Sequence, residues 1–322
     1  MMRLALSRPH PGYRRLTDAL GAAGVSSATP ERQPLVQARA QAEDFYRFVG
    51  GEPAPLPGVV DHAVPDSAGD IRLRLYHPGG ERPLPLAVYF HGGGYALNSI
   101  DTHDSLLRRI AAQAGVAVCA VGYGKAPETR YPGQLRQALH VLEWLKMESG
   151  SLDIAPHRLV LMGDSAGAHL ALTTALALPA DRCRALRGLV LAYGMFAPDF
   201  DSESHQAYGG GEYGLTTQRM RWFWDQFLPA GQNLSDPLVA PLHADLSNLP
   251  PVLLLAAELD CLRYDSLRLA QRLALAGRPH RLSVYPQVQH AFLMAHPWLD
   301  PATAAIGEIA ATLKEWLGEP ST

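Results

Sequence analysis

From residue 84 onward, short apolar runs rich in β-branched and aromatic residues alternate with stretches of helical periodicity. The run LPLAVYFHG (84–92) precedes an amphipathic stretch at 102–115, and VAVCAVGY (116–123) precedes another at 131–150. Strands that alternate with helices predict an α/β fold, because each helix leads the chain back along the sheet and leaves successive strands parallel. Further strands are expected at 59–66, 70–78, 158–165, 186–194, 251–260 and 280–290, and further helices at 166–178, 266–277 and 301–318. The expected architecture is a mostly parallel eight-stranded sheet with helices on both faces.

Two segments interrupt this alternation and are expected to form a helical cap over the carboxyl edge of the sheet. Residues 1–50 are rich in alanine and arginine, and the helical periodicity at 33–50 ends before a proline-rich linker at 51–58. Residues 195–248 are polar and glycine-rich around a single aromatic helix, and insertions this long inside a compact domain are usually lids or binding elements. The predicted division places the cap at 1–54 and 195–248, and the α/β core at 55–194 and 249–322.

Composition excludes several classes of partner. The chain has 322 residues, of which 47 % are apolar, so it can build a large core, and its formal charge of −3 comes without a run of lysine or arginine. Nucleic acid is therefore not an expected partner. No stretch approaches the roughly 18 uncharged apolar residues of a membrane helix, and the start of the chain lacks the apolar core of a signal peptide. We expect no membrane partner and a cytoplasmic location.

Neither a metal nor an organic cofactor is predicted. Cys119, Cys183 and Cys261 lack the spacing of a disulfide framework or a zinc site, and the histidines match no metal-binding pattern. The run GGGEYG (209–214) formally fits a dinucleotide-binding motif. No strand leads into it and no helix opens on its last glycine, so we interpret it as a loop.

The pentapeptide GDSAG (163–167) stands between an expected strand and an expected helix. In an open parallel sheet, ligands bind beyond the carboxyl ends of the strands. A tight turn there would hold Ser165 at its apex, and Gly163 and Gly167 would leave room for neighbouring backbone. The helix beginning at Ala166 would direct its free amides toward negative charge formed near the serine. Such a serine can also be a simple helix cap, but the strand before it favours a nucleophile.

A serine nucleophile also needs hydrogen-bond donors for the oxyanion that it generates. HGGGY (91–95) follows the apolar run that ends at Phe90, at the same edge of the predicted sheet as the serine. Three consecutive glycines let the backbone turn its amides toward a ligand. Gly93 and Gly94, with the amide of Ala166, are the predicted donors. The alternative is an ordinary flexible turn.

Two further residues complete a predicted triad. Asp260 ends the run PVLLLAAELD and His290 ends HRLSVYPQVQH, so both fall at strand carboxyl ends, where loops converge. The order Ser165, Asp260, His290 is that of α/β-hydrolases and differs from that of the chymotrypsin and subtilisin folds. His290 would exchange protons with Ser165 and the leaving group, and Asp260 would orient the imidazole.

Five blocks of the sequence carry a family resemblance. In chain order they are HGGGYALNSIDTHD (91–104), GYGKAPETRYP (122–132), GDSAG (163–167), AELDCLRYDS (257–266) and QHAFL (289–293). With these blocks the chain resembles the hormone-sensitive-lipase-like family of α/β-hydrolases, and within it the bacterial acetyl esterases. The resemblance implies the same triad and oxyanion residues, and a supporting role for His91 in its loop. Cys261 stands where the family usually has proline and Ala291 where it usually has glycine, which leaves the catalytic groups in place.

The resemblance further implies a serine carboxylic-ester hydrolase that acts on esters with short acyl chains. The sequence places no basic group in the site, so the expected partner is a small neutral ester. Tyr95, Tyr193, Trp224 and Phe227 are candidate pocket residues, although an aromatic stripe at helical spacing is also typical of packing.

Two other functions stay open at this stage. An acyltransferase would use the same acyl-enzyme, because the choice of acceptor depends on the shape of the cap and the exclusion of water. A non-catalytic ligand-binding protein on the hydrolase fold would be expected to lack the base, whereas His290 is present. A homo-oligomer also stays open.

Overall fold

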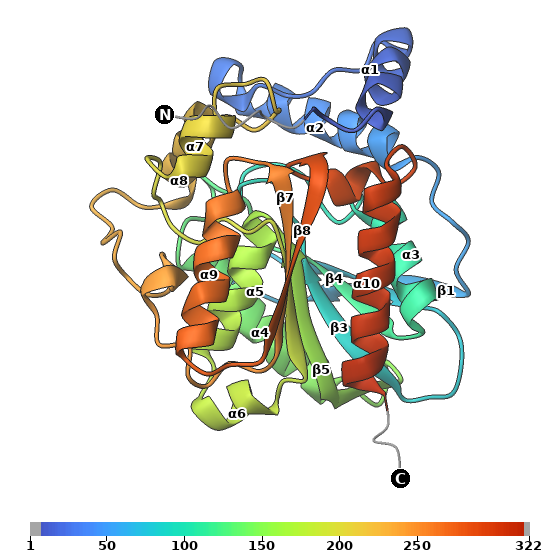
Figure 1. The fold of residues 1–322 in the computed structure, drawn as a ribbon. Coiled ribbons are helices and arrows are strands. Elements are labelled where there is room, and N and C mark those ends of the chain that lie inside the picture. The colour runs from blue at the N-terminus through green and yellow to red at the C-terminus, as the bar shows by residue number, and fades with distance from the viewer. Residues whose placement is uncertain (1–7, 319–322) are drawn as a thin grey trace.

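The computed structural model describes residues 8–318, and within them the strands form one eight-stranded sheet (Figure 1). The strands are β1 (Gly58–Val64), β2 (Ile71–His77), β3 (Leu84–Phe90), β4 (Ala117–Gly122), β5 (Ile154–Asp164), β6 (Gly188–Ala192), β7 (Val252–Leu259) and β8 (His280–Gln289). Their spatial order is β1-β2-β4-β3-β5-β6-β7-β8. β1 pairs antiparallel with β2 and β2 with β4, and every later pairing is parallel. The predicted α/β fold with a mostly parallel eight-stranded sheet is confirmed.

Helices cover both faces of this sheet (Figure 1). The α-helices are α1 (Gly12–Ala23), α2 (Leu35–Gly50), α3 (Asp104–Ala114), α4 (Gly133–Met147), α5 (Ala166–Ala177), α6 (Ala180–Ala185), α7 (Glu203–Tyr208), α8 (Thr217–Phe227), α9 (Arg263–Leu275) and α10 (Asp300–Leu317). The described residues also form the 3-10 turns η1 (Pro30–Arg32), η2 (Pro241–His243) and η3 (Phe292–Ala295). Every residue of β3 is buried, as expected for a strand with a helix layer on each side.

Alternate residues of β3 contact different cores because successive side chains point to opposite faces of a strand. Val88 and Phe90 belong to the hydrophobic cluster that includes α4, α5 and α9. Ala87 and Tyr89 belong to the cluster on the other face, with α3 and α10. The two layers fix the strands, and thereby the positions of the loops at their carboxyl ends.

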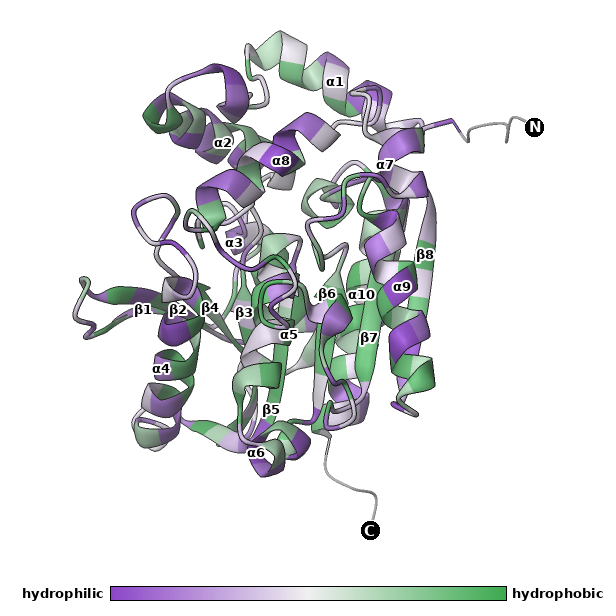
Figure 2. Cartoon of the chain, turned by 90° about the vertical axis from the view of Figure 1, so that its left-hand side faces the viewer, coloured by the Kyte–Doolittle hydropathy of each residue, from purple (hydrophilic) through white to green (hydrophobic). Residues whose placement is uncertain are grey.

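The helices of the two predicted cap segments lie beyond the carboxyl ends of the strands. α1 and α2 come from residues 1–54, α7 and α8 come from residues 195–248, and all four are at the same end of the molecule (Figures 1 and 2). The expectation of a single helix in the second segment is wrong. α7 is a separate short helix, whose first turn is capped because the Ser202 hydroxyl accepts a hydrogen bond from the amide of His205. Six residues are too few to show helical periodicity in the sequence.

The described residues bear on the remaining predictions from composition in three ways. Among them, no helix combines the length and apolar character needed to cross a membrane. Within residues 8–318, no cluster of three or more His, Cys, Asp or Glu side chains could hold a metal ion. Cys119, Cys183 and Cys261 are buried and free. The cytoplasmic location and the oligomeric state stay predictions.

Candidate active site

Ser165 occupies a strained turn between β5 and α5. β5 ends at Asp164 and α5 begins at Ala166, while Ser165 itself has φ 52° and ψ −119°, a conformation that costs a non-glycine residue free energy. The start of α5 also lies against the end of the neighbouring strand β3. A methyl group on Gly167 would lie 1.9 Å from the carbonyl oxygen of Phe90, so only glycine fits there. The amide of Ser165 donates a 2.8 Å hydrogen bond to the carbonyl of Ala192 on β6, which holds the turn in place.

The three residues of the predicted triad meet at this turn. His290 Nε2 lies 2.9 Å from Ser165 Oγ, and His290 Nδ1 lies 2.7 Å from Asp260 Oδ2. Asp260 follows β7 and His290 follows β8, so neighbouring parallel strands deliver both side chains to one edge of the sheet. The Asp260 side chain is fully buried, and its Oδ1 accepts a 3.0 Å bond from the amide of Leu262.

This geometry determines what the imidazole can do. Because Nδ1 faces a carboxylate, it carries the proton and donates, which leaves the lone pair of Nε2 directed at the serine hydroxyl. Such an imidazole can remove a proton from Ser165 Oγ and return it to a leaving group. The ring of Tyr193 packs edge-on against the His290 ring with centroids 5.0 Å apart, and this contact restricts rotation of the imidazole.

The predicted amide donors lie on the loop opposite the serine and at the start of α5. Gly93 has φ 116° and Gly94 has φ 59°, a region that favours glycine. Within residues 8–318, the amides of Gly93 and Gly94 have no acceptor. The amide of Ala166 belongs to the first turn of α5, where a helix leaves its N–H groups free. All three are available to a ligand at Ser165.

His91 supports the glycine loop through a hydrogen bond and a ring stack. Its Nδ1 donates a 2.8 Å hydrogen bond to the carbonyl of Gly92, and its ring stacks on Tyr123 with centroids 4.3 Å apart. The Tyr123 hydroxyl in turn donates to the carbonyl of His91 at 2.6 Å. Burial lowers the pKa of His91 to about 3, so the ring is neutral at physiological pH.

A cavity of about 660 Å³ opens over Ser165 and His290. Its walls come from α1, α2, α8, the glycine loop and the segment after β8. The main apolar lining residues are Leu16, Leu20, Val25, Phe45, Val49, Leu97, Met195, Leu215, Met220, Phe223, Phe292 and Met294. Gly93 and Gly94 are also in the wall, so the serine, the imidazole and these two glycines border one common space.

None of the four aromatic residues predicted to form the pocket is among the described residues that line this cavity. Tyr95 stacks on Phe227 with ring centroids 3.9 Å apart, and its hydroxyl lies 2.6 Å from Nδ1 of the buried His169. Trp224 packs edge-on against His169, and Tyr193 supports the catalytic-site imidazole. These side chains pack against other buried rings and do not contact the cavity. This is the alternative that an aromatic stripe at helical spacing also allows.

The lining residues that the sequence analysis missed come mostly from the N-terminal helices and from the other face of α8. Helical periodicity at 33–50 contains a usable signal, because Ala42, Phe45 and Val49 share the face that meets the cavity. On α8 the cavity side is formed by Met220 and Phe223, one helical turn apart. Periodicity identifies such a face, but not the surface that it covers.

A basic residue does line the cavity, contrary to the expectation from sequence. Arg219 at the start of α8 is in the wall, but its Nε lies 3.1 Å from Oε2 of Glu31 in η1, and both side chains are largely buried. The ion pair leaves no net charge for a ligand. It also ties the N-terminal segment to the insertion across the cavity.

The chain is similar to known ester hydrolases in both sequence and structure. A family model described as the alpha/beta hydrolase fold matches residues 87–294. An ethyl acetate hydrolase of Pseudomonas putida is 33 % identical over 287 residues, which cover 87 % of this chain and 90 % of that protein. An acetyl esterase of Salmonella choleraesuis is 33 % identical over 234 residues, 72 % of each chain. The structure of a hyperthermophilic esterase from the archaeon Pyrobaculum calidifontis superposes with a TM-score of 0.87 at 32 % identity, covering 96 % of this chain and 98 % of that one.

Proposed function

The chain belongs to the alpha/beta hydrolase fold family, in its hormone-sensitive-lipase-like branch, and is a carboxylic-ester hydrolase; from this we propose that it cleaves small neutral esters with short acyl chains through an acyl-enzyme on Ser165. The observation that carries the proposal is the unbroken hydrogen-bonded series from Asp260 through His290 to Ser165. It stands beside amides that have no acceptor among residues 8–318 and opens into a cavity with a largely apolar wall.

In the first half of the reaction, Ser165 Oγ attacks the carbonyl carbon of the ester while His290 Nε2 takes the hydroxyl proton. The carbonyl oxygen becomes an oxyanion, which accepts hydrogen bonds from the amides of Gly93, Gly94 and Ala166. The bond between the carbonyl carbon and the alkoxy oxygen then breaks, and His290 gives its proton to the departing alcohol. The acyl group stays on Ser165 as an ester.

In the second half, water replaces the serine as the nucleophile. His290 Nε2 removes a proton from the water, whose oxygen attacks the acyl carbon. The same amides hold the second oxyanion, the bond to Ser165 Oγ breaks, and the serine regains its proton from His290. The carboxylic acid leaves. Asp260 orients the imidazole throughout and stabilises its protonated form.

The proposed substrate class follows from the wall of the cavity and from the relatives. Arg219 is neutralised by Glu31 and the remaining wall is mostly apolar, which supports a neutral ester. The proteins named an ethyl acetate hydrolase and an acetyl esterase support a short acyl group. Residues 1–54 and 195–248 are proposed to act as the cap that separates this space from solvent, because α1, α2 and α8 supply much of its wall.

The test of this proposal compares the wild type with Ser165→Ala on p-nitrophenyl acetate. Loss of the nucleophile is expected to reduce turnover by about three to six orders of magnitude, with covalent labelling by a fluorophosphonate abolished. Unreduced hydrolysis in Ser165→Ala would reject the proposal. Product ratios in the presence of an added alcohol separate hydrolysis from acyl transfer, which uses the same acyl-enzyme.

A further inference from the structure

Asp164, the residue before the serine, has a buried carboxylate that takes no part in the reaction steps proposed for the triad. Asp164 is 2 % exposed and lies at the edge of the cavity. Its Oδ1 accepts three hydrogen bonds: from the Tyr89 hydroxyl at 2.7 Å, from the amide of Gly92 at 2.7 Å and from His103 Nε2 at 3.1 Å. The donors come from β3, from the glycine loop and from the segment before α3, so one oxygen atom joins three parts of the chain.

The contact with Gly92 links the serine turn directly to the oxyanion loop. A methyl group on Gly92 would lie 2.5 Å from Asp164 Oδ2, so the glycine backbone rests against the carboxylate. The hydrogen bond from the Gly92 amide fixes the plane of the peptide bond that precedes it. The backbone continues from this fixed plane into Gly93 and Gly94, which line the cavity.

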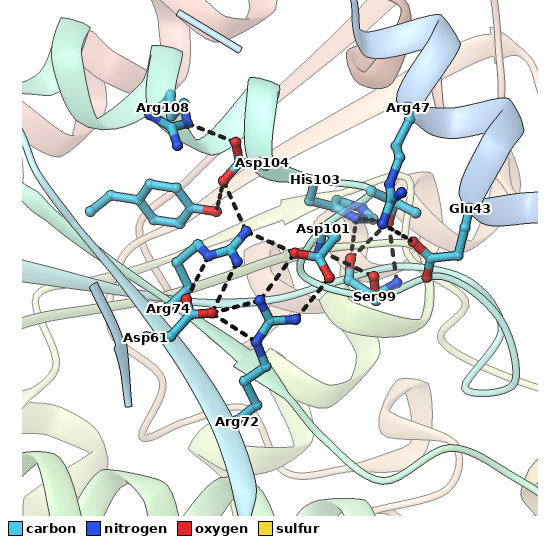
Figure 3. A network of polar contacts seen from close by, with 12 residues as sticks. Glu43, Arg47, Asp61, Arg72, Arg74, Ser99, Asp101, His103, Asp104 and Arg108 are labelled. Atoms are coloured by element: carbon cyan, nitrogen blue, oxygen red, sulfur yellow. Dashed lines mark hydrogen bonds and ion pairs between the residues drawn. The ribbon is translucent and has the colours of Figure 1, made fainter. Parts of the chain in front are cut away.

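His103 is itself held on its other side. Its ring is fully buried, and Nδ1 lies 2.8 Å from Thr102 Oγ1 and 3.2 Å from the carbonyl oxygen of Ser99. Asp101, within the same segment, forms an ion pair with Arg74 of β2 at 2.8 Å (Figure 3). The ring therefore presents Nε2 to Asp164 from an anchored turn.

The charge of Asp164 matters because it lies one residue from the place where an oxyanion would form. Burial opposes ionisation of this carboxyl group, but the charge of His103 and the hydrogen bonds from His103, Tyr89 and Gly92 outweigh it. The pKa of Asp164 therefore lies below its ordinary value. The ionised carboxylate accepts hydrogen bonds from these three donors, and charge-assisted hydrogen bonds of this kind are strong.

We propose that Asp164 and His103 are positioning residues that hold the Gly93–Gly94 loop at the distance from Ser165 that oxyanion binding requires. This inference rests on the proposed function. It assigns the second residue of the GDSAG block to the geometry of the oxyanion site. The buried histidine supports the carboxylate, and the carboxylate supports the loop.

The test measures kcat, KM and the affinity for a reversible trifluoromethyl ketone, which forms a tetrahedral adduct with the serine. In Asp164→Asn and in His103→Ala, kcat per fluorophosphonate-titrated site is expected to fall by about 10- to 100-fold, since losing one oxyanion donor costs about 100- to 1,000-fold. KM should stay within about threefold, and the inhibitor affinity should fall in parallel with kcat. His103→Gln keeps an N–H near the position of Nε2 and should recover part of the loss.

Two tyrosines offer a matched control. Tyr89 and Tyr76 are both buried, and each donates its hydroxyl to a buried carboxylate, at 2.7 Å to Asp164 and at 2.9 Å to Asp104. Tyr89→Phe and Tyr76→Phe should therefore lose similar thermal stability. Only Tyr89→Phe should lower kcat per site and the affinity for the trifluoromethyl ketone.

The alternative is a purely structural role. It would reduce thermal stability and the number of titrated sites while kcat per site and inhibitor affinity stay at wild-type values, and that result would overturn the inference. If Asp164→Asn does not fold, His103→Ala and Tyr89→Phe decide in the same way. Wild-type kcat per site in these variants, with an inactive Ser165→Ala, rejects the positioning role alone. An active Ser165→Ala rejects the proposed function.

Discussion

The amide of Gln289 donates a 2.8 Å hydrogen bond to the hydroxyl of Tyr13, so α1 contacts the chain one residue before His290. A second bond of 2.8 Å, from the amide of His10 to the carbonyl of Gln287, joins the same two segments. The N-terminal segment therefore does more than line the cavity. It holds the loop that carries the proposed base.

Tyr13→Phe removes this hydroxyl and leaves the ring in place. The Gln289 amide then loses its acceptor, and a lost hydrogen bond of this kind costs about 1 kcal/mol. Because the unpaired amide lies one residue before His290, we expect kcat to decrease by about three- to tenfold with little change in KM. Tyr131→Phe is the matched control. The Tyr131 hydroxyl donates a 3.0 Å hydrogen bond to Asp236, and neither residue contacts the triad. Equal kinetics in the two variants would argue against a role for α1 in holding the base.

Gly94→Ala is expected to abolish most activity. A methyl group at this position would lie 2.0 Å from Cδ1 of Phe223, so either the oxyanion loop or α8 must move. We expect a loss of kcat of at least about 100-fold, the scale of a lost oxyanion donor. Steady-state kinetics on p-nitrophenyl acetate measures it.

Gly115→Ala separates this clash from backbone strain. Gly115 has φ 66°, close to the 59° of Gly94, but a methyl group there meets no atom within 4 Å. Both variants carry the cost of a non-glycine residue in the left-handed region, roughly 1 kcal/mol. Only the variant at Gly94 should lose catalysis. Similar losses in both would mean that backbone strain, and not the clash with Phe223, accounts for the effect of Gly94→Ala.

The parts of the molecule that sequence could predict are those governed by local pattern. Buried strands such as 84–90 and 252–259 are recognisable because they are apolar throughout, and the turn at Ser165 because its glycines stand where two backbones touch. Parallel strands end at one edge of the sheet, so the convergence of Asp260 and His290 could be expected from their places in the order of strands.

The identity of the cavity wall could not be predicted in the same way. Whether Phe223 or Trp224 faces the substrate depends on how α8 rotates against α1 and α2, which are more than 160 residues away in sequence. Arg219 illustrates the same limit, because its partner Glu31 lies 188 residues away. Helical periodicity marks an apolar face but contains no information on its partner.

Phe223→Ala should broaden the range of esters. The Phe223 side chain is in the cavity wall against Gly94, so its removal enlarges the space next to the proposed oxyanion site. We expect kcat/KM for p-nitrophenyl octanoate, relative to the acetate, to rise by about tenfold, within the range that changes in a hydrophobic pocket produce. A series of p-nitrophenyl esters from acetate to decanoate measures the change.

Trp224→Ala is the control from the same helix. Trp224 is similarly buried but packs on His169 outside the cavity wall, so its loss should reduce stability and leave the preference for acyl length unchanged. A shift in acyl preference for Trp224→Ala, or none for Phe223→Ala, would contradict the wall as described.

A buried carboxyl group, that of Asp265, lies in the first turn of α9. Asp265 is 1 % exposed, and its Oδ2 accepts hydrogen bonds from the amides of Phe196 at 2.7 Å and Ala197 at 3.2 Å. Burial raises the pKa of Asp265 from 3.8 to about 7, against the hydrogen bonds that lower it. Because the folded state holds the proton more tightly than the unfolded chain, this group's contribution to stability is fully present below pH about 4 and is lost as pH rises toward about 7.

Asp265→Asn keeps an acceptor for both amides but cannot ionise. Each pKa unit corresponds to about 1.4 kcal/mol, so the variant should gain up to roughly 4 kcal/mol on the wild type between pH 4 and pH 8. Thermal unfolding of both proteins at pH 4.5, 6 and 8 measures this gain, and the other titrating groups cancel in the difference. A constant difference in Tm across these three pH values would show that Asp265 ionises as an ordinary carboxyl group.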